Sequence, residues 1–191
     1  MIEKLIKLNR TYRRFYQNHK ISDDNLLKLV NYARLTGSAA NLQPLKYYIS
    51  NNEKNNNQIF SKIAWAGYLS DWAGPEEGEK PSSYIVILGD TKISKQRSVD
   101  VGIAAQSIML GAVEMELGGC MFGAIKRDEL KSLLGFDEHL EIELVIALGK
   151  PKEQIILEDV ESNNVKYWRD ENQVHHVPKR KIEEIIIKTE K

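Results

Sequence analysis

Residues 100–124 read DVGIAAQSIMLGAVEMELGGCMFGA, a helical pattern followed by a short strand between glycines. Asp100 stands at the position of a helix N-cap, and the residues that follow it are apolar at helical spacing. The most apolar part, residues 101–113, is shorter than the roughly 20 residues that a membrane span needs. We therefore predict a buried helix whose small residues allow a second helix to approach closely. Its apolar face comprises Val101, Ala104, Ala105, Ile108, Ala112 and Met115.

The rest of the chain combines helical and strand patterns, which indicates a mixed fold. Ser22 is placed to cap a helix with apolar residues at 26, 29, 30 and 33, and the sequence at 36–38 is typical of a helix end. Short β-branched or aromatic runs between turn residues predict strands at residues 46–50, 84–88 and 141–148. Residues 51–57, which are rich in asparagine, and residues 75–81 are predicted to be loops.

The chain has 191 residues, a length that predicts one domain with an extension. Its 27 basic residues equal its 27 acidic residues, so we expect no partner bound by bulk charge, such as a nucleic acid. The charge is distributed unevenly, because residues 1–20 and 178–181 are mainly basic whereas residues 137–161 are mainly acidic. A local anion site is therefore compatible with a net charge of zero.

The residues after Pro151 form a mostly polar segment with few apolar anchors. A tail of this kind seldom builds its own core, so we predict that residues 151–191 form an arm that packs on a second copy of the chain. Residues 1–150 would then be the core of the same single domain. The apolar anchors of the arm are Tyr167, Trp168, Val174, Val177 and residues 182–187.

Several classes of protein are excluded by what the sequence lacks. Cys120 is the single cysteine, which excludes an intramolecular disulfide and favours the reducing cytoplasm as the location. Its apolar neighbours indicate a buried thiol and not a nucleophile. No apolar leader follows Met1, so we expect neither a signal peptide nor a membrane partner. We also expect no metal site, because no ligand spacing surrounds the four histidines, His19, His139, His175 and His176, of which the last two are expected on the exposed arm.

Three segments remain as candidates for ligand binding. In NRTYRRF, residues 9–15, the guanidinium groups suit a phosphate or another planar acceptor. In GSAANLQPL, residues 37–45, small residues let a ligand reach the backbone while Asn41 and Gln43 offer amides. In LGGCMFGA, residues 117–124, a terminal glycine allows a flat ligand to stack against the backbone. For the first two segments alone, the competing interpretation is ordinary structure: surface arginines and a connecting loop.

Taken in this order, the segments resemble the nitroreductase family of flavin mononucleotide (FMN) enzymes. The family shows an early R-x-S-x-R element, a P-S-x-x-N-x-Q-P-W element, a buried helix followed by a G-L-G-x-x-x-x-G-A strand, a late A-L-G-x-P and a basic C-terminal element. The resemblance covers nearly the whole chain. The matching residues are RTYR at 10–13, GSAANLQPL at 37–45, DVGIAAQ at 100–106, LGGCMFGA at 117–124, ALGKP at 147–151 and PKR at 178–180.

The resemblance implies an α+β, nitroreductase-like fold, in which helices flank a mostly antiparallel central sheet. It also implies an intertwined homodimer that holds one FMN at each of two interface sites. The flavin phosphate would be held by Arg10 with Lys179 or Arg180. Thr11 and Arg13 would contact the ribityl chain or the pyrimidine side of the ring. The other implied contacts are Ser38, Ala39, Asn41 and Gln43, which line the flavin of the other subunit, and the backbone of Phe122 and Gly123, which lies against its dimethylbenzene–N5 edge.

The implied activity is that of an FMN-dependent oxidoreductase in which the flavin carries the chemistry and the protein supplies no catalytic residue. NAD(P)H would reduce the flavin and leave, and a small electron-poor acceptor, such as a nitroaromatic or a quinone, would then bind on the same face. The absence of a dinucleotide fingerprint agrees with a nicotinamide that stacks only transiently. Trp65, Tyr68 and Trp72 are candidates for the acceptor pocket. The alternatives are another flavin reaction on this scaffold (dehalogenation, flavin fragmentation, enoyl or aldehyde reduction) and a non-catalytic flavin-binding protein.

Overall fold

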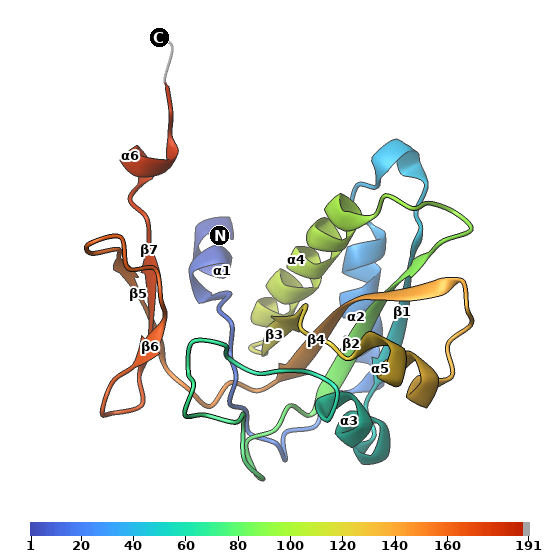
Figure 1. Cartoon of the computed structure of the whole chain (residues 1–191), viewed down its shortest axis with the longest axis horizontal. Helices are drawn as coiled ribbons and strands as arrows, with labels where there is room; N and C mark the ends of the chain where they lie inside the picture. The colour runs from blue at the N-terminus through green and yellow to red at the C-terminus, as the bar shows by residue number, and fades with distance from the viewer. Residues whose placement is uncertain (189–191) are drawn as a thin grey trace. The chain divides into compact units, whose positions relative to one another are not determined.

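The computed structural model describes residues 1–188, which fall into two compact units (Figure 1). Unit 1 comprises residues 1–65 and 74–152. Unit 2 comprises residues 66–73 together with the chain from residue 153 onward. No helix within the described part of the chain has both the length and the apolar character needed to cross a membrane.

Unit 1 is built on a four-stranded antiparallel sheet with the strand order β1-β2-β4-β3. Each strand predicted from the sequence is present, with bounds within two residues of the expected ones. Helices flank the sheet, so the predicted α+β architecture is confirmed. The strands are β1 (Leu45–Ser50), β2 (Ser83–Asp90), β3 (Gly118–Phe122) and β4 (Leu140–Gly149).

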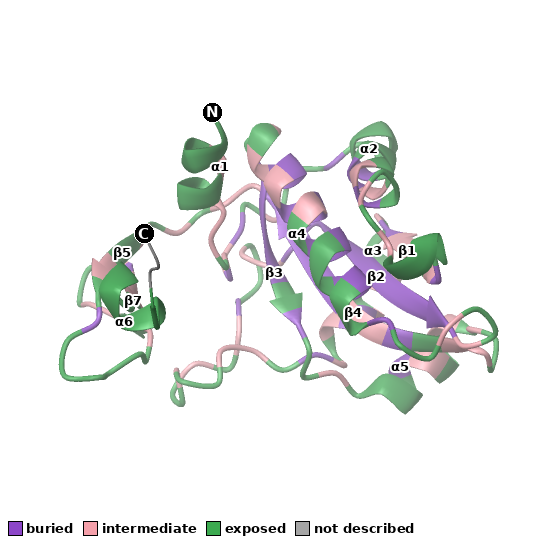
Figure 2. Ribbon diagram, turned by 90° about the horizontal axis from the view of Figure 1, so that it is seen from above, coloured by how far each residue is buried: buried purple, intermediate pink, exposed green. Residues whose placement is uncertain are grey.

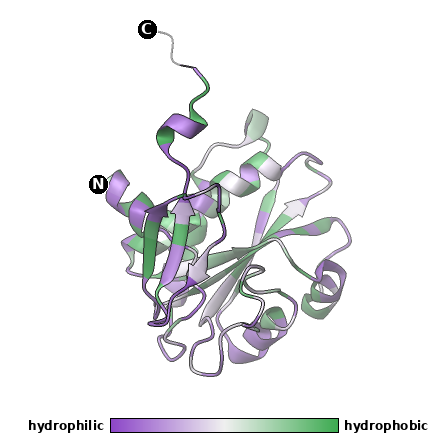
Figure 3. Ribbon diagram, turned by 60° about the vertical axis from the view of Figure 1, so that its left-hand side comes forward, coloured by the Kyte–Doolittle hydropathy of each residue, from purple (hydrophilic) through white to green (hydrophobic). Residues whose placement is uncertain are grey.

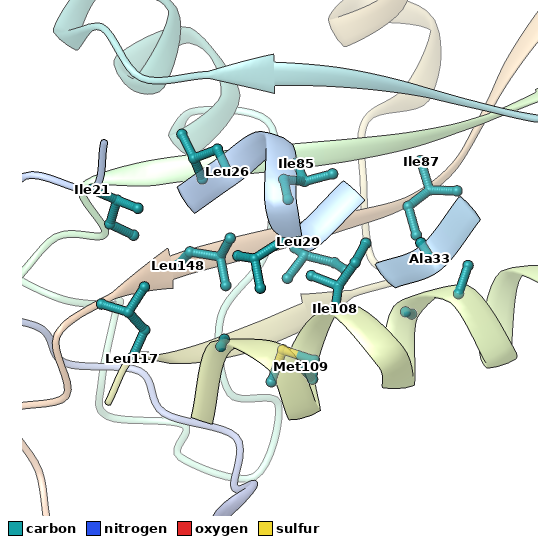
Figure 4. Close-up of a cluster of buried hydrophobic side chains, with 14 of the residues drawn as sticks. Ile21, Leu26, Leu29, Ala33, Ile85, Ile87, Ile108, Met109, Leu117 and Leu148 are labelled. Atoms are coloured by element: carbon teal, nitrogen blue, oxygen red, sulfur yellow. The ribbon is translucent and has the colours of Figure 1, made fainter. Parts of the chain in front are cut away.

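The central strand β2 is buried along its whole length (Figure 2) because both of its faces are covered. Side chains of a strand alternate between faces, so Ile85 and Ile87 join one hydrophobic cluster and Val86 joins the other. Figure 4 shows the first cluster, in which Leu29 and Ile108 lie beside Ile85. The first cluster packs under α2 (Asp23–Arg34) and α4 (Ser98–Glu114), and the second under α3 (Glu53–Phe60) and α5 (Arg127–Leu134).

Helices α2 and α4 form largely as their sequence patterns predict. The Ser22 hydroxyl caps α2, accepting a hydrogen bond from the Asn25 amide at 3.3 Å. The small residues of α4 do allow a close helix contact, since a side chain at Gly111 would collide with the ring of Tyr32 on α2. One face of α4 nevertheless stays exposed within the described chain, so the prediction of a buried helix holds for one face only.

Two local predictions are wrong. Residues 51–57 are not a loop, because helix α3 starts at Glu53 and the Asn52 carboxamide caps it, accepting from the Asn55 amide at 2.9 Å. Asparagine favours turns and caps alike, so the composition alone did not distinguish a loop from a helix start. Asp100 is not the N-cap of α4, because the helix begins at Ser98 and places Asp100 inside the first turn.

Replacing Asn52 with alanine should therefore destabilise unit 1 through α3. An N-cap side chain satisfies a backbone N–H that has no other partner, and its loss typically costs about 0.5–2 kcal/mol. We expect a free energy of unfolding about 1 kcal/mol lower, measured by urea denaturation. Asn57→Ala is the matched control, because Asn57 lies within the same helix and is exposed. Equal losses in the two variants would contradict the capping role.

Unit 2 contains a three-stranded sheet of order β5-β7-β6, in which β5 and β7 are parallel. An ion pair between Arg169 and Glu153, at 3.0 Å, is almost fully buried, and His175 is 1% exposed. The prediction that His175 is exposed is therefore wrong. Residues 66–73 belong to the same unit, in which Tyr68 packs on Tyr167 and Trp72 on Arg169. The elements are β5 (Ile155–Asp159), β6 (Trp168–Arg169), β7 (His175–Lys179) and α6 (Ile182–Ile185), and isoleucines exposed in and after α6 are green in Figure 3.

We predict that His176 in β7 makes the stability of the protein depend on pH. Its Nδ1 lies 2.9 Å from Glu158 Oε2, its Nε2 lies 3.5 Å from Asp170 Oδ2, and the Trp168 ring stacks on it. The hydrogen bond to Glu158 and the second carboxylate raise the pKa of His176, and burial only partly opposes them.

A pKa raised by folding means that the protonated histidine stabilises the folded state. This contribution is fully present below the unfolded pKa of about 6.5 and is lost as the pH rises through the folded value. We expect the free energy of unfolding of the wild type, measured at a series of pH values, to exceed that of His176→Gln only on the acidic side. The exposed His19→Gln is the control and should follow the wild type. Parallel curves for wild type and His176→Gln would contradict this assignment.

Candidate functional site

The arginine-rich segment that follows α1 (Ile2–Leu8) runs beside the edge strand β3. The Tyr12 amide donates to the Gly119 carbonyl at 2.9 Å, and Thr11 forms a parallel bridge with the same glycine. Any side chain at Gly118 would collide with the Tyr12 ring, which explains the need for glycine there. Two of the three segments singled out in the sequence are therefore neighbours in unit 1.

Arg10 places a guanidinium at this position, and the described chain provides acceptors for only some of its hydrogen-bond donors. Its Nη2 donates to the Ile6 carbonyl at 2.6 Å. Its Nε is buried, and no group among residues 1–188 accepts a hydrogen bond from it. Burial lowers the pKa of Arg10, although a guanidinium remains charged at neutral pH. Within the same segment Arg13 is buried and Thr11 is exposed.

The loop of residues 38–43 lies over the first turn of α4 and is attached to it by Asp100. The Ser38 hydroxyl donates to Asp100 Oδ2 at 2.5 Å, and the Ala39 amide donates to Oδ1 at 3.1 Å. The same hydroxyl accepts from the Gln43 amide at 2.9 Å, which closes the loop. The Gln43 side chain donates to the Asn41 carbonyl at 3.2 Å.

The backbone of this loop adopts an unusual conformation for residues with side chains. Ala40, Asn41 and Gln43 have φ angles of 49°, 53° and 51°, all in the left-handed region. Such conformations cost about 1–3 kcal/mol each and persist only where the surroundings enforce them, often at ligand clamps. All three residues are exposed, so their polar groups are accessible to a ligand.

A pocket of about 210 Å³ opens beside the loop. Ser38 and Gln43 line it together with Asp100, Tyr47 and Lys46. Burial, aided by the nearby charge of Asp100, raises the pKa of Tyr47 to about 12, so this hydroxyl keeps its proton at neutral pH. The pocket therefore offers hydroxyl and amide groups, one carboxylate and two cations, since Arg34 also lines it.

The far end of β3 gives an open backbone beside packed aromatic rings. Gly123 is exposed, and a methyl group at its Cα would meet no atom within 4 Å. The side chain of Phe122 is buried, and its ring centroid lies 4.6 Å from that of Trp65. Only the backbone of Phe122 and Gly123 is thus available to a ligand, and Trp65 takes part in core packing.

Comparison with known proteins identifies the family to which the chain belongs. The model of the nitroreductase family matches residues 6–150, about three quarters of the chain. The chain belongs to the nitroreductase family. The match includes the arginine segment, the loop at 38–43 and the strand β3.

Relatives in this family span almost the same length. A protein of Archaeoglobus fulgidus with the provisional name NADH dehydrogenase/NAD(P)H nitroreductase is 27% identical over 163 residues, and the match covers 80% of this chain and 88% of that one. A nitroreductase family protein of Clostridium novyi is 25% identical, with a TM-score of 0.68 over 80% of this chain and 87% of that one. A structure from Desulfovibrio desulfuricans, described provisionally as a nitroreductase in complex with FMN, has a TM-score of 0.71 at 18% identity and covers 99% and 96% of the two chains.

The predicted site residues of this nitroreductase family member are divided between the two units. The residues predicted at the arginine segment, the loop and β3 are in unit 1, as is Trp65. Lys179 and Arg180 are in unit 2, where Arg180 contacts Asn163 and Glu184. The two other predicted pocket residues are also there: Tyr68 packs on Tyr167, and Trp72 on Arg169.

Sequence reasoning missed the part that Asp100 and Tyr47 play in this family member. Asp100 was assigned to a helix cap, and Tyr47 to an ordinary strand. One signal was present, because an acidic residue directly precedes the apolar face of a helix. A carboxylate buried at such a position needs hydrogen-bond donors. The donors themselves come from a loop about sixty residues earlier in the chain, which no local pattern links to the helix.

Proposed function

We propose that this protein binds FMN and is an NAD(P)H-dependent oxidoreductase that delivers electrons to a small electron-poor acceptor such as a nitroaromatic or a quinone. The observation that carries the proposal is the family match over residues 6–150, which includes the arginine segment with its partly unsatisfied cation. The relative whose provisional name includes NAD(P)H nitroreductase supports the electron donor. The FMN complex of the Desulfovibrio protein supports the cofactor.

The residues of unit 1 fit a flavin with a phosphate tail. An anion beside Arg10 would accept the hydrogen bond that its buried Nε leaves unmade, which removes a desolvation penalty. Hydrogen bonds between guanidinium and phosphate are among the stronger ones in proteins. We propose that Thr11 and Arg13 bind the ribityl chain or the pyrimidine side. That Lys179 or Arg180 adds to the phosphate site rests on the family resemblance alone.

The loop at 38–43 and Gly123, which follows β3, fit the flat ring system. Within the loop, Ala40, Asn41 and Gln43 have a left-handed backbone and are exposed. We propose Ser38, Ala39, Asn41 and Gln43 as contacts to the ring. The open space at Gly123 would let the ring approach the backbone of Phe122 and Gly123. When bound, FMN supplies a hydride acceptor and donor at its N5 atom. The chain's own residues would bind and orient the ring, and solvent would supply the proton.

We propose that the donor and the acceptor use one face of the site in turn. The chain shows no dinucleotide-binding fingerprint, so a nicotinamide would bind there by stacking only. Trp65, Tyr68 and Trp72 remain proposed for the acceptor pocket, although each of them already packs on a neighbouring ring or cation. Such packing would hold these rings in place.

We propose a homodimer in the cytoplasm as the working form. Helix α4 exposes Val99 and Ile103, at 68% and 40%, although its opposite face is core. A neutral net charge removes the repulsion between copies. Sedimentation velocity should give the mass of a dimer, and a monomer at micromolar concentration would contradict this part of the proposal.

Titration with FMN tests the binding step. Adding the purified protein should quench flavin fluorescence and saturate at one FMN per chain. A chain that leaves the fluorescence unchanged would overturn the proposal as a whole. Saturable binding followed by no reduction with either NADH or NADPH would instead favour the non-catalytic alternative.

A further inference from the structure

Asp100 occupies a costly position for a carboxylate. It is 4% exposed and lies in the first turn of α4, directly before the buried Val101. A buried charge is tolerated when donors surround it, and here both oxygens accept hydrogen bonds. Both donors belong to one loop, through the Ser38 hydroxyl and the Ala39 amide.

Through Ser38 the carboxylate also acts on the far end of the loop. The Ser38 hydroxyl has one proton, which it donates to Asp100, so its lone pairs are left to accept from the Gln43 amide. Asp100 thereby orients a relay of two hydrogen bonds, in which the Gln43 amide donates to the Ser38 hydroxyl and this hydroxyl donates to Asp100 on α4. The three left-handed residues lie between these anchors, where an enforced backbone conformation is needed.

We propose that Asp100 is a positioning residue of the flavin site, which holds residues 38–43 in the conformation that contacts the flavin ring. The inference rests on the proposed function and deepens it, because it assigns the order of the loop to one buried carboxylate. Asp100 acts through Ser38 and Ala39, and its effect concerns the ring and not the phosphate. Without the carboxylate the loop would relax from its left-handed backbone before any ligand binds.

The test compares FMN with riboflavin, which has the same ring and no phosphate. Asp100→Asn removes one acceptor and the charge at nearly constant volume. We expect its dissociation constants for FMN and for riboflavin to rise by the same factor, about tenfold, which corresponds to about 1.4 kcal/mol. Asp100→Glu keeps the charge but displaces the oxygens, so it should weaken both ligands as well. The double variant Ser38→Ala/Asp100→Asn should bind both flavins only slightly more weakly than whichever single variant binds them more weakly, because both substitutions break the same relay.

A second readout needs no flavin. Hydrogen exchange of the Ala39 and Gln43 amides in the unliganded protein should be faster in Asp100→Asn than in the wild type. The control is Glu143→Gln, which removes a carboxylate from the ion pair with Arg97 at the same end of α4. It should leave both flavin affinity and loop exchange unchanged, even if it lowers thermal stability.

The possible failures are distinguishable. A wild type that binds neither FMN nor riboflavin overturns the proposed function, and this inference with it. A wild type that binds both, with Asp100→Asn equal to it in affinity and in amide exchange, overturns the inference alone. If Asp100→Asn does not fold, Asp100→Glu decides in the same two measurements.

Discussion

Arg10→Ala should weaken FMN binding roughly ten- to hundredfold, because a hydrogen bond to a charged group contributes about 1.5–3 kcal/mol. The guanidinium is pre-placed for this role: Nη2 is held by the Ile6 carbonyl, and the buried Nε has no acceptor among residues 1–188. The effect should be specific for the phosphate. Fluorescence titration should therefore show a large loss for FMN and almost none for riboflavin.

Lys7→Ala is the matched control, since it removes one positive charge a few residues earlier, on the exposed helix α1. Exposed charges are screened by salt, so this variant should bind FMN nearly as the wild type does. Equal losses for FMN and riboflavin in Arg10→Ala would assign the residue to the fold and contradict a phosphate contact. A shared loss of this kind is what we expect instead from Asp100→Asn.

Leu29→Ala should destabilise the flavin-free protein by about 2–5 kcal/mol. Leu29 is fully buried at the contact of α2 with α4, where Gly111 and Tyr32 bring the helices together and leave little room to collapse. The loss is a large share of the roughly 5–15 kcal/mol that stabilises a typical domain. Denaturant unfolding should show it directly, and Tm should fall by roughly 2–4 °C for each kcal/mol.

Leu27→Ala on the same helix provides the comparison, because Leu27 is 59% exposed. The truncation deletes the same side-chain atoms, but in Leu27 they are largely exposed to water. It should therefore change the free energy of unfolding by less than about 0.5 kcal/mol. Equal losses of stability in the two variants would contradict the placement of Leu29 in a tightly packed core between α2 and α4.

The core of the fold could be predicted from sequence because its signals are local. The cap at Ser22, the helical spacing behind it and the apolar run of β2 each specify one element. Residues 51–57 were ambiguous because asparagine serves both as a helix cap and as a turn former, and the helix buries a single residue, Ile59, in the core. The sheet order also lies beyond local patterns, since β4 pairs with β2 across more than fifty residues.

The segments of the candidate site could be recognised in the sequence, whereas the contacts between them could not. The motifs at 10–13, 37–45 and 117–124 were visible as unusual polar or glycine-rich segments. Their arrangement depends on long-range contacts, such as Thr11 with Gly119 and Ser38 with Asp100, which no spacing rule provides. The buried carboxylate shows this most clearly, because its donors are meaningful only after the loop has folded onto α4.

Anaerobic mixing of the FMN-loaded protein with NADH and, separately, with NADPH tests the central claim most directly. We expect at least one of them to bleach the visible absorbance of the oxidised flavin, and a nitroaromatic or a quinone then to restore it. Arg10→Ala, loaded to the same occupancy, should bleach at a similar rate, because its phosphate contact lies outside the chemistry. A bound flavin that neither nucleotide bleaches would contradict the assignment as an NAD(P)H oxidoreductase.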